Sequence, residues 1–342
     1  RRSELSKEVT TMNNSAKEFN PRSAFLRFFA ITLVVCAFLT AYAFSVYKPK
    51  KADAAAHSGA VVIEASTGRV LYSDNMNVRT YPASTTKILT ALVTLENIPL
   101  DTVVTVPDCA AGVEGSSIYL RKGEKLTTSE LLYGLMLRSG NDAAVALAVS
   151  VAGSIEKFAD MMNDRAVRCG AVNSNFVNPH GLHDDNHYTT AYDLALITAE
   201  AYKNADFRRI VATKNVTISG AEGKRYLSNK NKLLTTFDGA NGVKTGYTTK
   251  SGRCLVGGAE RDGMQLISVV LNRYDMWEAT KKLLEDAFAT YEMRELPVLP
   301  FPDENAGNLR VDVKVGDDGE LTPSFYPVKK DGSEIPYAVY GG

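Results

Sequence analysis

The spacing of hydrophobic and polar positions changes along the chain and separates regions of different secondary structure. Two apolar runs, Gly59–Ala65 and Arg69–Ser73, surround the turn Ser66–Gly68 and predict a β-hairpin. After Pro82 the apolar positions recur at helical spacing as far as Leu95, which predicts a buried helix. The folded part of the chain therefore begins with strands and continues into a helix.

A capping-box pattern, Thr127 followed three residues later by Glu130, opens the next predicted helix at Leu131–Leu137. Before it, residues 109–126 are rich in glycine and predict a loop. Apolar periodicity predicts three further helices, at 143–151, 155–168 and 190–204.

The pattern then returns to strands. The segments 242–249, 253–259 and 264–271 are β-compatible, and Arg261–Gly263 is a strong hairpin-turn signal between the last two. An amphipathic helix is predicted at 275–291. Strands at both ends therefore bracket a mainly helical insertion, which predicts an α+β fold with an antiparallel sheet.

The composition predicts three regions, 1–56, 57–292 and 296–342. Six of the 12 prolines fall in the last 46 residues, where Leu309–Val315 alternates in polarity, so the tail is expected to be a short β-rich appendage. Near the other end, Phe28–Val46 is apolar and uncharged, follows a polar lead and precedes the small residues 52–56. These features are typical of a secretion signal or a retained transmembrane anchor, and we expect the region that follows to lie outside the cytoplasmic membrane.

Composition narrows the choice of function only a little. The chain has 342 residues, 45% of them hydrophobic, and 39 Lys and Arg against 39 Asp and Glu, so its charge balance gives no reason to expect a nucleic acid partner. Cys36 lies inside the apolar segment, and the remaining cysteines, Cys109, Cys169 and Cys254, match no disulfide or zinc spacing. They are expected to be mostly buried free thiols.

The candidate chemistry lies at the start of the first predicted helix. Ser84 and Lys87 are three residues apart, so they share a helix face and their side chains can reach one another. A serine needs an adjacent base, and a lysine whose pKa is lowered can be that base. The same spacing occurs at Ser45–Lys48, beside the apolar segment, and at Ser154–Lys157, where Ser154 is better explained as a helix N-cap.

Three motifs follow one another in a fixed order: Ser84-Thr-Thr-Lys87, Ser139-Gly-Asn141 and Lys244-Thr-Gly246. In this order they resemble the active-site serine, penicillin-binding family, and specifically the low-molecular-weight D-alanyl-D-alanine carboxypeptidases of peptidase family S11. The resemblance covers about Ser58 to Tyr291 and includes the segments 178–182 and 229–234. It implies a β-lactamase/transpeptidase-like fold.

The resemblance also implies a role for each motif. Ser84 would be acylated, Lys87 would be its general base, and Ser139 would relay a proton toward the leaving group. The residues implied to bind substrate are Asn141, Lys244, Thr245, Gly246 and Tyr247. No cofactor is implied. The substrate would be a peptidoglycan stem peptide ending in D-Ala-D-Ala, and β-lactams would be covalent inhibitors.

Physical chemistry agrees with these roles. A substrate that ends in a carboxylate needs a fixed cation, and Lys244 would supply one that also helps keep Lys87 neutral. The backbone N–H groups of Ser84 and Tyr247 are the implied oxyanion donors. The tail lacks the terminal amphipathic helix of many relatives, which makes the N-terminal apolar segment the expected membrane tether.

Three other functions compete with this interpretation. A serine β-lactamase is closest in fold, but the Glu-x-x-Leu-Asn segment of the most similar class is missing between Asn141 and Lys244. A catalytically silent penicillin-binding scaffold would not need the intact catalytic residues. A metallopeptidase would need a metal site, for which the closely spaced residues are His180, His183, Asp184 and His187. The flanking Pro179 and Gly181 predict an irregular loop rather than a ligand-bearing helix.

Overall fold

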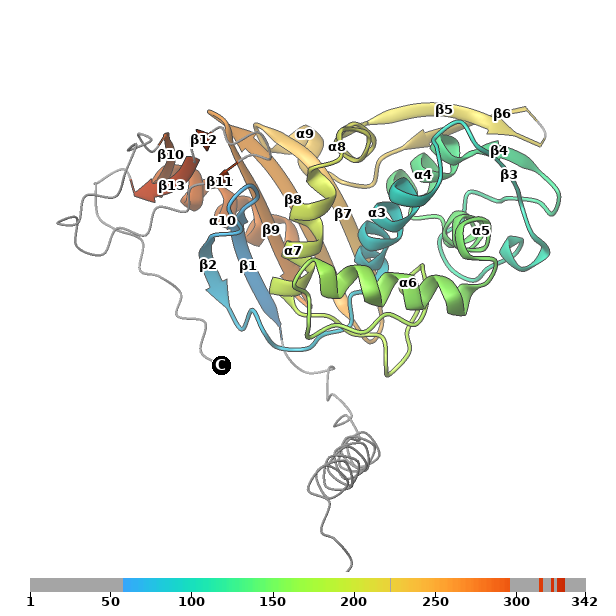
Figure 1. Ribbon diagram of the computed structural model, residues 1–342, viewed down its shortest axis with the longest axis horizontal. Helices are drawn as coiled ribbons and strands as arrows, with labels where there is room; N and C mark the ends of the chain where they lie inside the picture. The colour runs from blue at the N-terminus through green and yellow to red at the C-terminus, as the bar shows by residue number, and fades with distance from the viewer. Residues whose placement is uncertain (1–57, 222, 296–313, 316–320, 323–324, 330–342) are drawn as a thin grey trace, which may run out of the picture. The chain divides into compact units, whose positions relative to one another are not determined.

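The computed structural model describes residues 58–221, 223–295, 314–315, 321–322 and 325–329, and its largest sheet has five strands in the order β2-β1-β9-β8-β7 (Figure 1). All neighbouring strands in this sheet are antiparallel. The strands are β1 (Gly59–Glu64), β2 (Val70–Asp74), β7 (Ala240–Thr248), β8 (Gly252–Arg261) and β9 (Met264–Leu271).

Strand β1, from the start of the domain, lies between its hairpin partner β2 and the late strand β9. The β1–β2 hairpin turns at Ser66–Gly68 as predicted, and Gly68 has the positive φ of 69° that favours glycine. On its other edge β1 pairs with β9, where Gly59 lies opposite Leu271. The predicted α+β arrangement, in which strands from both ends bracket a helical insertion, is confirmed.

Both faces of the sheet are covered, which explains why β1 is apolar along most of its length. Val61 and Ile63 belong to the main core that the insertion helices complete, whereas Val62 packs in a second cluster with Leu284 and Phe288 of α10 (Met276–Thr290). A strand that is buried on both faces shows no alternation of apolar and polar residues.

The insertion contains the helices α3 (Lys87–Asn97), α4 (Thr128–Leu137), α5 (Asn141–Ala152), α6 (Ile155–Arg168), α7 (Ala191–Tyr202) and α8 (Ala205–Ala212). Five of these were predicted and α8 was not. The predicted capping box at Thr127 and Glu130 is present, and Ser154 Oγ accepts a hydrogen bond from Lys157 N as an N-cap.

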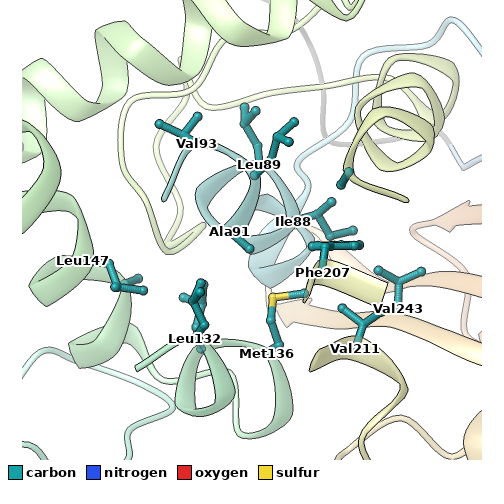
Figure 2. Packing of buried hydrophobic residues seen from close by; sticks show 14 of the residues in the cluster. Ile88, Leu89, Ala91, Val93, Leu132, Met136, Leu147, Phe207, Val211 and Val243 are labelled. Carbon is teal, nitrogen blue, oxygen red and sulfur yellow. The ribbon is translucent and has the colours of Figure 1, made fainter. Parts of the chain in front are cut away.

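Helix α3 lies at the centre of the main core, and residues 87–94 are all buried. Figure 2 shows its apolar side chains in one cluster with those of α4, α5, α8 and β7; Ile88, Leu132, Phe207 and Val243 are among them. Burying one large aliphatic side chain contributes about 1.5–3 kcal/mol to folding. This packing fixes α3, and with it the turn that precedes it.

Two small hairpins lie outside the main sheet. β3 (Val103–Thr105) pairs with β4 (Lys125–Thr127), and the segment between them contains the short helix η2 (Asp108–Ala110). β5 (Asn215–Gly220) pairs with β6 (Gly223–Ser228); this hairpin was not predicted.

The cysteine prediction was right about pairing and partly wrong about burial. Cys109, Cys169 and Cys254 are free thiols, but only Cys254 is buried, Cys169 is partly exposed, and Cys109 is exposed. Cys109 is exposed because it sits on η2, in the connection between β3 and β4, rather than on a core element.

Near the C-terminus, β10 (Tyr291–Glu295) pairs with β13 (Phe325–Lys329), and β11 (Lys314–Val315) pairs with β12 (Leu321–Thr322). The rest of the predicted tail lies outside the described residues, as do the lead 1–56 and its apolar segment Phe28–Val46. Within the described part of the chain, no helix has the length and apolar character needed to cross a bilayer.

Candidate active site

The turn η1 (Ala83–Thr86) carries Ser84 directly before α3, and Lys87 is the first residue of that helix. Pro82 precedes the turn and restricts the backbone where it begins. Lys87 Nζ lies 3.1 Å from Ser84 Oγ, so the two groups that the sequence paired are within hydrogen-bond distance.

The amine of Lys87 is enclosed by acceptors from distant parts of the chain. Nζ lies 2.7 Å from Oδ1 of Asn141 and 2.6 Å from the carbonyl oxygen of His180. The Lys87 side chain is fully buried, and its pKa is held well below the ordinary lysine value, first by burial and then by the positive charges of Lys244 and Lys230. The site therefore favours the neutral amine, which is the basic form.

A second buried lysine lies on β7. Lys244 is 2% exposed and its Nζ donates to the carbonyl oxygen of Thr245 at 2.9 Å. Burial, with a smaller contribution from the charge of Lys230, lowers the pKa of Lys244 to about 7. Near neutral pH this lysine therefore changes charge readily, and a ligand carboxylate would favour its protonated form.

Ser139 lies in the turn between α4 and α5. It has a φ of 64°, and its side chain is nearly fully buried. Its hydroxyl oxygen has no hydrogen-bond partner within the described part of the chain. A buried hydroxyl without a partner costs free energy unless a ligand or water satisfies it, which is typical of a binding or catalytic group.

A pocket of about 410 Å³ unites residues from the three motifs. Its walls include Ser84, Ser139, Thr245, Gly246 and Tyr247, joined by residues that the sequence did not single out: Ser116, Arg253, Met276 and Trp277. Lys230, which lies in the segment 229–234 that the resemblance includes, also lines the pocket. The structure thus brings together the motifs from α3, the α4–α5 turn and β7.

Strand β7 approaches the serine turn closely at Gly246. A Cβ there would lie 3.0 Å from the Pro82 carbonyl oxygen and 3.1 Å from the Ser84 backbone nitrogen, which is tighter than ordinary packing. Asn141 lies behind the serine, where its Nδ2 donates to the carbonyl oxygen of Glu114. This bond and the contact with Lys87 Nζ fix the orientation of the amide.

The histidine-rich segment forms an irregular connection between α6 and α7, as predicted, but it also reaches Lys87. Gly181 has a φ of 82°, and a Cβ at this position would overlap the carbonyl oxygen of Ala83. His187 Nε2 lies 2.8 Å from the hydroxyl of Thr86.

Burial, followed by the charge on Lys87, lowers the pKa of both His180 and His187 to about 3, so both rings are neutral near pH 7. Among the described residues, no group of three potential metal ligands is found.

Two contributors were missed because they are backbone groups. The carbonyl oxygens of His180 and Glu114 orient Lys87 and Asn141, and the residue type gives no sign of such a role, because every residue has a carbonyl oxygen.

The side chain of Asp142 was also missed. It is buried, and its carboxylate accepts hydrogen bonds from Ser117 Oγ and from the backbone nitrogens of Ile118 and Leu120, which pins the loop that forms one pocket wall.

Comparisons with known proteins agree with this geometry. A family model described as D-alanyl-D-alanine carboxypeptidase, Peptidase S11, matches residues 45–275. The chain is 37% identical over 265 residues to D-alanyl-D-alanine carboxypeptidase DacF of Bacillus subtilis (strain 168), covering 74% of this chain and 68% of that protein. It is also 37% identical to the D-alanyl-D-alanine carboxypeptidase of Streptomyces sp. (strain K15) over 62% of this chain and 79% of that one.

Solved structures give the same picture. The D-alanyl-D-alanine carboxypeptidase DacD from Francisella tularensis superposes with a TM-score of 0.69 at 29% identity, covering 80% of each chain. A serine-to-alanine mutant of the Streptomyces K15 DD-transpeptidase superposes with a TM-score of 0.64 at 34% identity, covering 69% of this chain and 98% of that one.

Proposed function

This chain belongs to the Peptidase S11 family of D-alanyl-D-alanine carboxypeptidases, and from that premise we propose how its residues act. It is a serine-type D-alanyl-D-alanine carboxypeptidase that removes the terminal D-alanine from peptidoglycan stem peptides. β-Lactams bind at the same site. The observation that carries the assignment of residues is the set of three contacts around Nζ of Lys87.

A neutral amine has two N–H donors and one lone pair. The carbonyl oxygens of Asn141 and His180, at 2.7 and 2.6 Å, accept the two N–H groups. The lone pair is then left for the hydroxyl hydrogen of Ser84, whose oxygen lies 3.1 Å away. Lys87 is in this way oriented as well as neutral, and it acts as the general base.

In the acylation step, Ser84 Oγ forms a bond to the carbonyl carbon of the penultimate D-alanine while its proton passes to Lys87. The bond from that carbon to the terminal D-alanine nitrogen then breaks, and the nitrogen takes up the proton through Ser139. The buried, unpartnered hydroxyl of Ser139 supports this relay. Water attacks the resulting ester, with Lys87 again taking the proton, and Ser84 is restored.

Three further sets of contacts with the substrate complete the reaction. The terminal carboxylate docks at Lys244 and Thr245, and its negative charge favours the protonated form of Lys244. The backbone N–H groups of Ser84 and Tyr247 receive the oxyanion, and the close approach at Gly246 supports this pairing of turn and strand. Asn141 holds the substrate backbone in addition to orienting Lys87.

The enzyme acts in the bacterial cell envelope. We propose that the apolar segment Phe28–Val46 directs export and serves as the membrane tether; its uncharged length supports this. We further propose that residues 57–292 form the catalytic domain and residues 296–342 a β-rich appendage, in keeping with the change of composition between them.

The test is release of free D-alanine from a peptide ending in D-Ala-D-Ala by the full-length protein. Wild type is expected to release D-alanine and to be labelled covalently by penicillin, and Ser84→Ala is expected to do neither. Ser154→Ala is the matched control, because it breaks the same Ser-x-x-Lys spacing at an N-cap and should leave turnover intact.

Other outcomes would contradict parts of the proposal. Labelling that survives in Ser84→Ala would refute the nucleophile. Rapid penicillin hydrolysis without D-alanine release would favour a β-lactamase, and neither activity would favour a silent penicillin-binding scaffold.

A further inference from the structure

A second hollow, of about 620 Å³, lies between the loop 117–121 and the β5–β6 hairpin. Arg138 and hairpin residues of the segment 220–228 complete its lining. We refer to it as the hairpin groove. None of its residues belongs to the three catalytic motifs.

The hairpin groove adjoins the catalytic pocket along a shared wall. Ser116 lines the catalytic pocket, and the next residue, Ser117, lines the groove. In the same way, Ser139 lines the catalytic pocket and its neighbour Arg138 lines the groove. The wall is held together because Lys230 Nζ donates to Ser116 Oγ at 3.1 Å. A ligand that leaves the catalytic pocket over this wall therefore enters the groove.

The described residues that line the groove include four basic side chains, Arg121, Arg138, Lys224 and Arg225, and no acidic one. Arg225 is ion-paired with Glu124, at 2.5 Å. Among the described residues, which do not include Glu222, no carboxylate pairs with Arg138 or Lys224. Among the described lining residues, positive side chains therefore outnumber negative ones, and Lys224 and Arg138 are positive charges that no described carboxylate neutralises.

The groove is built before any ligand arrives. Glu124 is 9% exposed, and besides Arg225 it accepts a hydrogen bond from the backbone nitrogen of Ala221 at 2.7 Å. Glu130 accepts one from the backbone nitrogen of Ser219 at 2.9 Å. These bonds anchor the hairpin to the residue before β4 and to the first turn of α4, so binding would not have to order the hairpin.

Two exposed aromatic rings accompany the basic residues. Tyr226 is 67% exposed and Tyr119 is 81% exposed. Tyr119 also has a φ of 61°, and the bonds of Asp142 to Ile118 and Leu120 hold the loop on either side of it. A bulky residue kept in this backbone conformation, and exposed, is typical of a recognition position.

We propose that the hairpin groove binds the carboxylate-bearing part of the stem peptide that lies upstream of the scissile bond. The inference rests on the proposed function, because the terminal carboxylate occupies the Lys244 side of the catalytic pocket. The acyl portion then leaves across the shared wall at Ser116 and Ser139, toward Arg121 and Lys224. Binding of this remote part aligns the scissile bond at Ser84, and the exposed tyrosines cover the apolar atoms of the peptide.

The experiment uses two peptides ending in D-Ala-D-Ala that differ only in an upstream residue, glutamate in one and glutamine in the other. The readout is the ratio of their kcat/KM values at low ionic strength, because general damage to the enzyme lowers both alike. Wild type should prefer the glutamate peptide about three- to tenfold, as expected for one or two exposed charge pairs. The variant Arg121→Gln/Lys224→Gln should bring the ratio close to one.

A matched control removes one arginine and one lysine elsewhere. Lys157 and Arg168 are exposed on α6 and line neither the groove nor the catalytic pocket. Lys157→Gln/Arg168→Gln should keep the wild-type ratio. A wild-type ratio near one, or a high ratio that survives in Arg121→Gln/Lys224→Gln, would overturn the proposal.

Equilibrium binding of the same two peptides to the Ser84→Ala protein separates this proposal from the proposed function. If neither peptide is cleaved by wild type, the proposed function fails, but tighter binding of the glutamate peptide that depends on Arg121 and Lys224 still supports the groove. Equal binding of both peptides overturns the groove even if the enzyme is an active carboxypeptidase.

Discussion

The carbonyl oxygen of His180 lies 2.6 Å from Nζ of Lys87, although the two residues are 93 positions apart in the sequence. With Asn141 Oδ1 on another side, it leaves the amine one free direction, toward Ser84. The loop between α6 and α7 therefore helps to orient Lys87, the proposed general base.

Replacing Asn141 with Asp should impair the base, and it also removes the Nδ2 donor to the Glu114 carbonyl oxygen. A carboxylate beside Lys87 favours the protonated amine, so it raises the pKa of Lys87 and moves the acid limb of the kcat/KM profile to higher pH. We expect at least a tenfold loss of kcat/KM at pH 7, with partial recovery as the pH rises.

Asn97→Asp adds the same charge at the far end of α3, about 15 Å along the helix, and should leave the pH profile in place. A profile for Asn141→Asp that coincides with that of wild type would contradict the role given to this amide.

Lys244 should produce an alkaline limb in kcat/KM. Its pKa is lowered to about 7, so it is charged below that pH and loses its charge above it. The terminal carboxylate of the substrate should therefore be captured less well as the pH rises, by about tenfold per pH unit beyond the limb. Lys244→Arg keeps a positive charge and should shift the limb upward, although with a lower maximum because the buried site is shaped for lysine.

The control for this prediction is the same peptide with a C-terminal amide, which has no carboxylate for Lys244 to bind. An alkaline limb of equal size and position with the amide would assign that limb to another group.

Gly181→Ala should destabilise the protein and reduce activity together. The new methyl group would overlap the carbonyl oxygen of Ala83, next to the proposed nucleophile Ser84, in addition to straining a backbone with a φ of 82°. We expect a loss of more than about 3 kcal/mol in the free energy of unfolding, measured with urea, and a clear fall in D-alanine release.

Gly153→Ala separates steric overlap from backbone strain. Gly153 has nearly the same φ, 81°, but no atom lies within 4 Å of its added methyl group. It should lose only about 1 kcal/mol and keep its activity. Equal effects at both glycines would show that the close approach to Ala83 is unimportant.

Cys109 should be the fast-reacting thiol of the described domain. It is exposed, whereas Cys254 is buried and burial raises the pKa of both Cys254 and Cys169 to about 11. Labelling of the native protein with a thiol reagent should lose its fast phase in Cys109→Ser, and labelling of Cys254 should need unfolding. A fast phase that persists in Cys109→Ser would contradict this order of reactivity.

The sequence predicted those features of this protein that depend on patterns only a few residues long. The capping box at Thr127 and the Arg261–Gly263 turn are such signals, and so is the three-residue spacing that brings Lys87 to Ser84. Each depends on neighbours within a few residues, so composition and spacing are enough to find them.

Features that depend on distant partners were missed. The β5–β6 hairpin buries only Ile218 and Leu227, so its apolar pattern is weak, and it is held instead by the carboxylates of Glu124 and Glu130. The contribution of His180 is a carbonyl oxygen, which every residue possesses. Only the folded chain reveals which of these oxygens faces a lysine.

The insertion of β1 between β2 and β9 also sets the order in which the molecule becomes active. In a chain synthesised from its N-terminus, the proposed nucleophile Ser84 appears some 160 residues before Lys244, and the sheet that joins their two regions is complete only when β9 has been made and pairs with β1. Pairings between such distant segments form slowly. A chain in which β9 has not yet paired with β1 is therefore expected to be inactive, because the sheet that holds Ser84 and Lys244 in one site is incomplete.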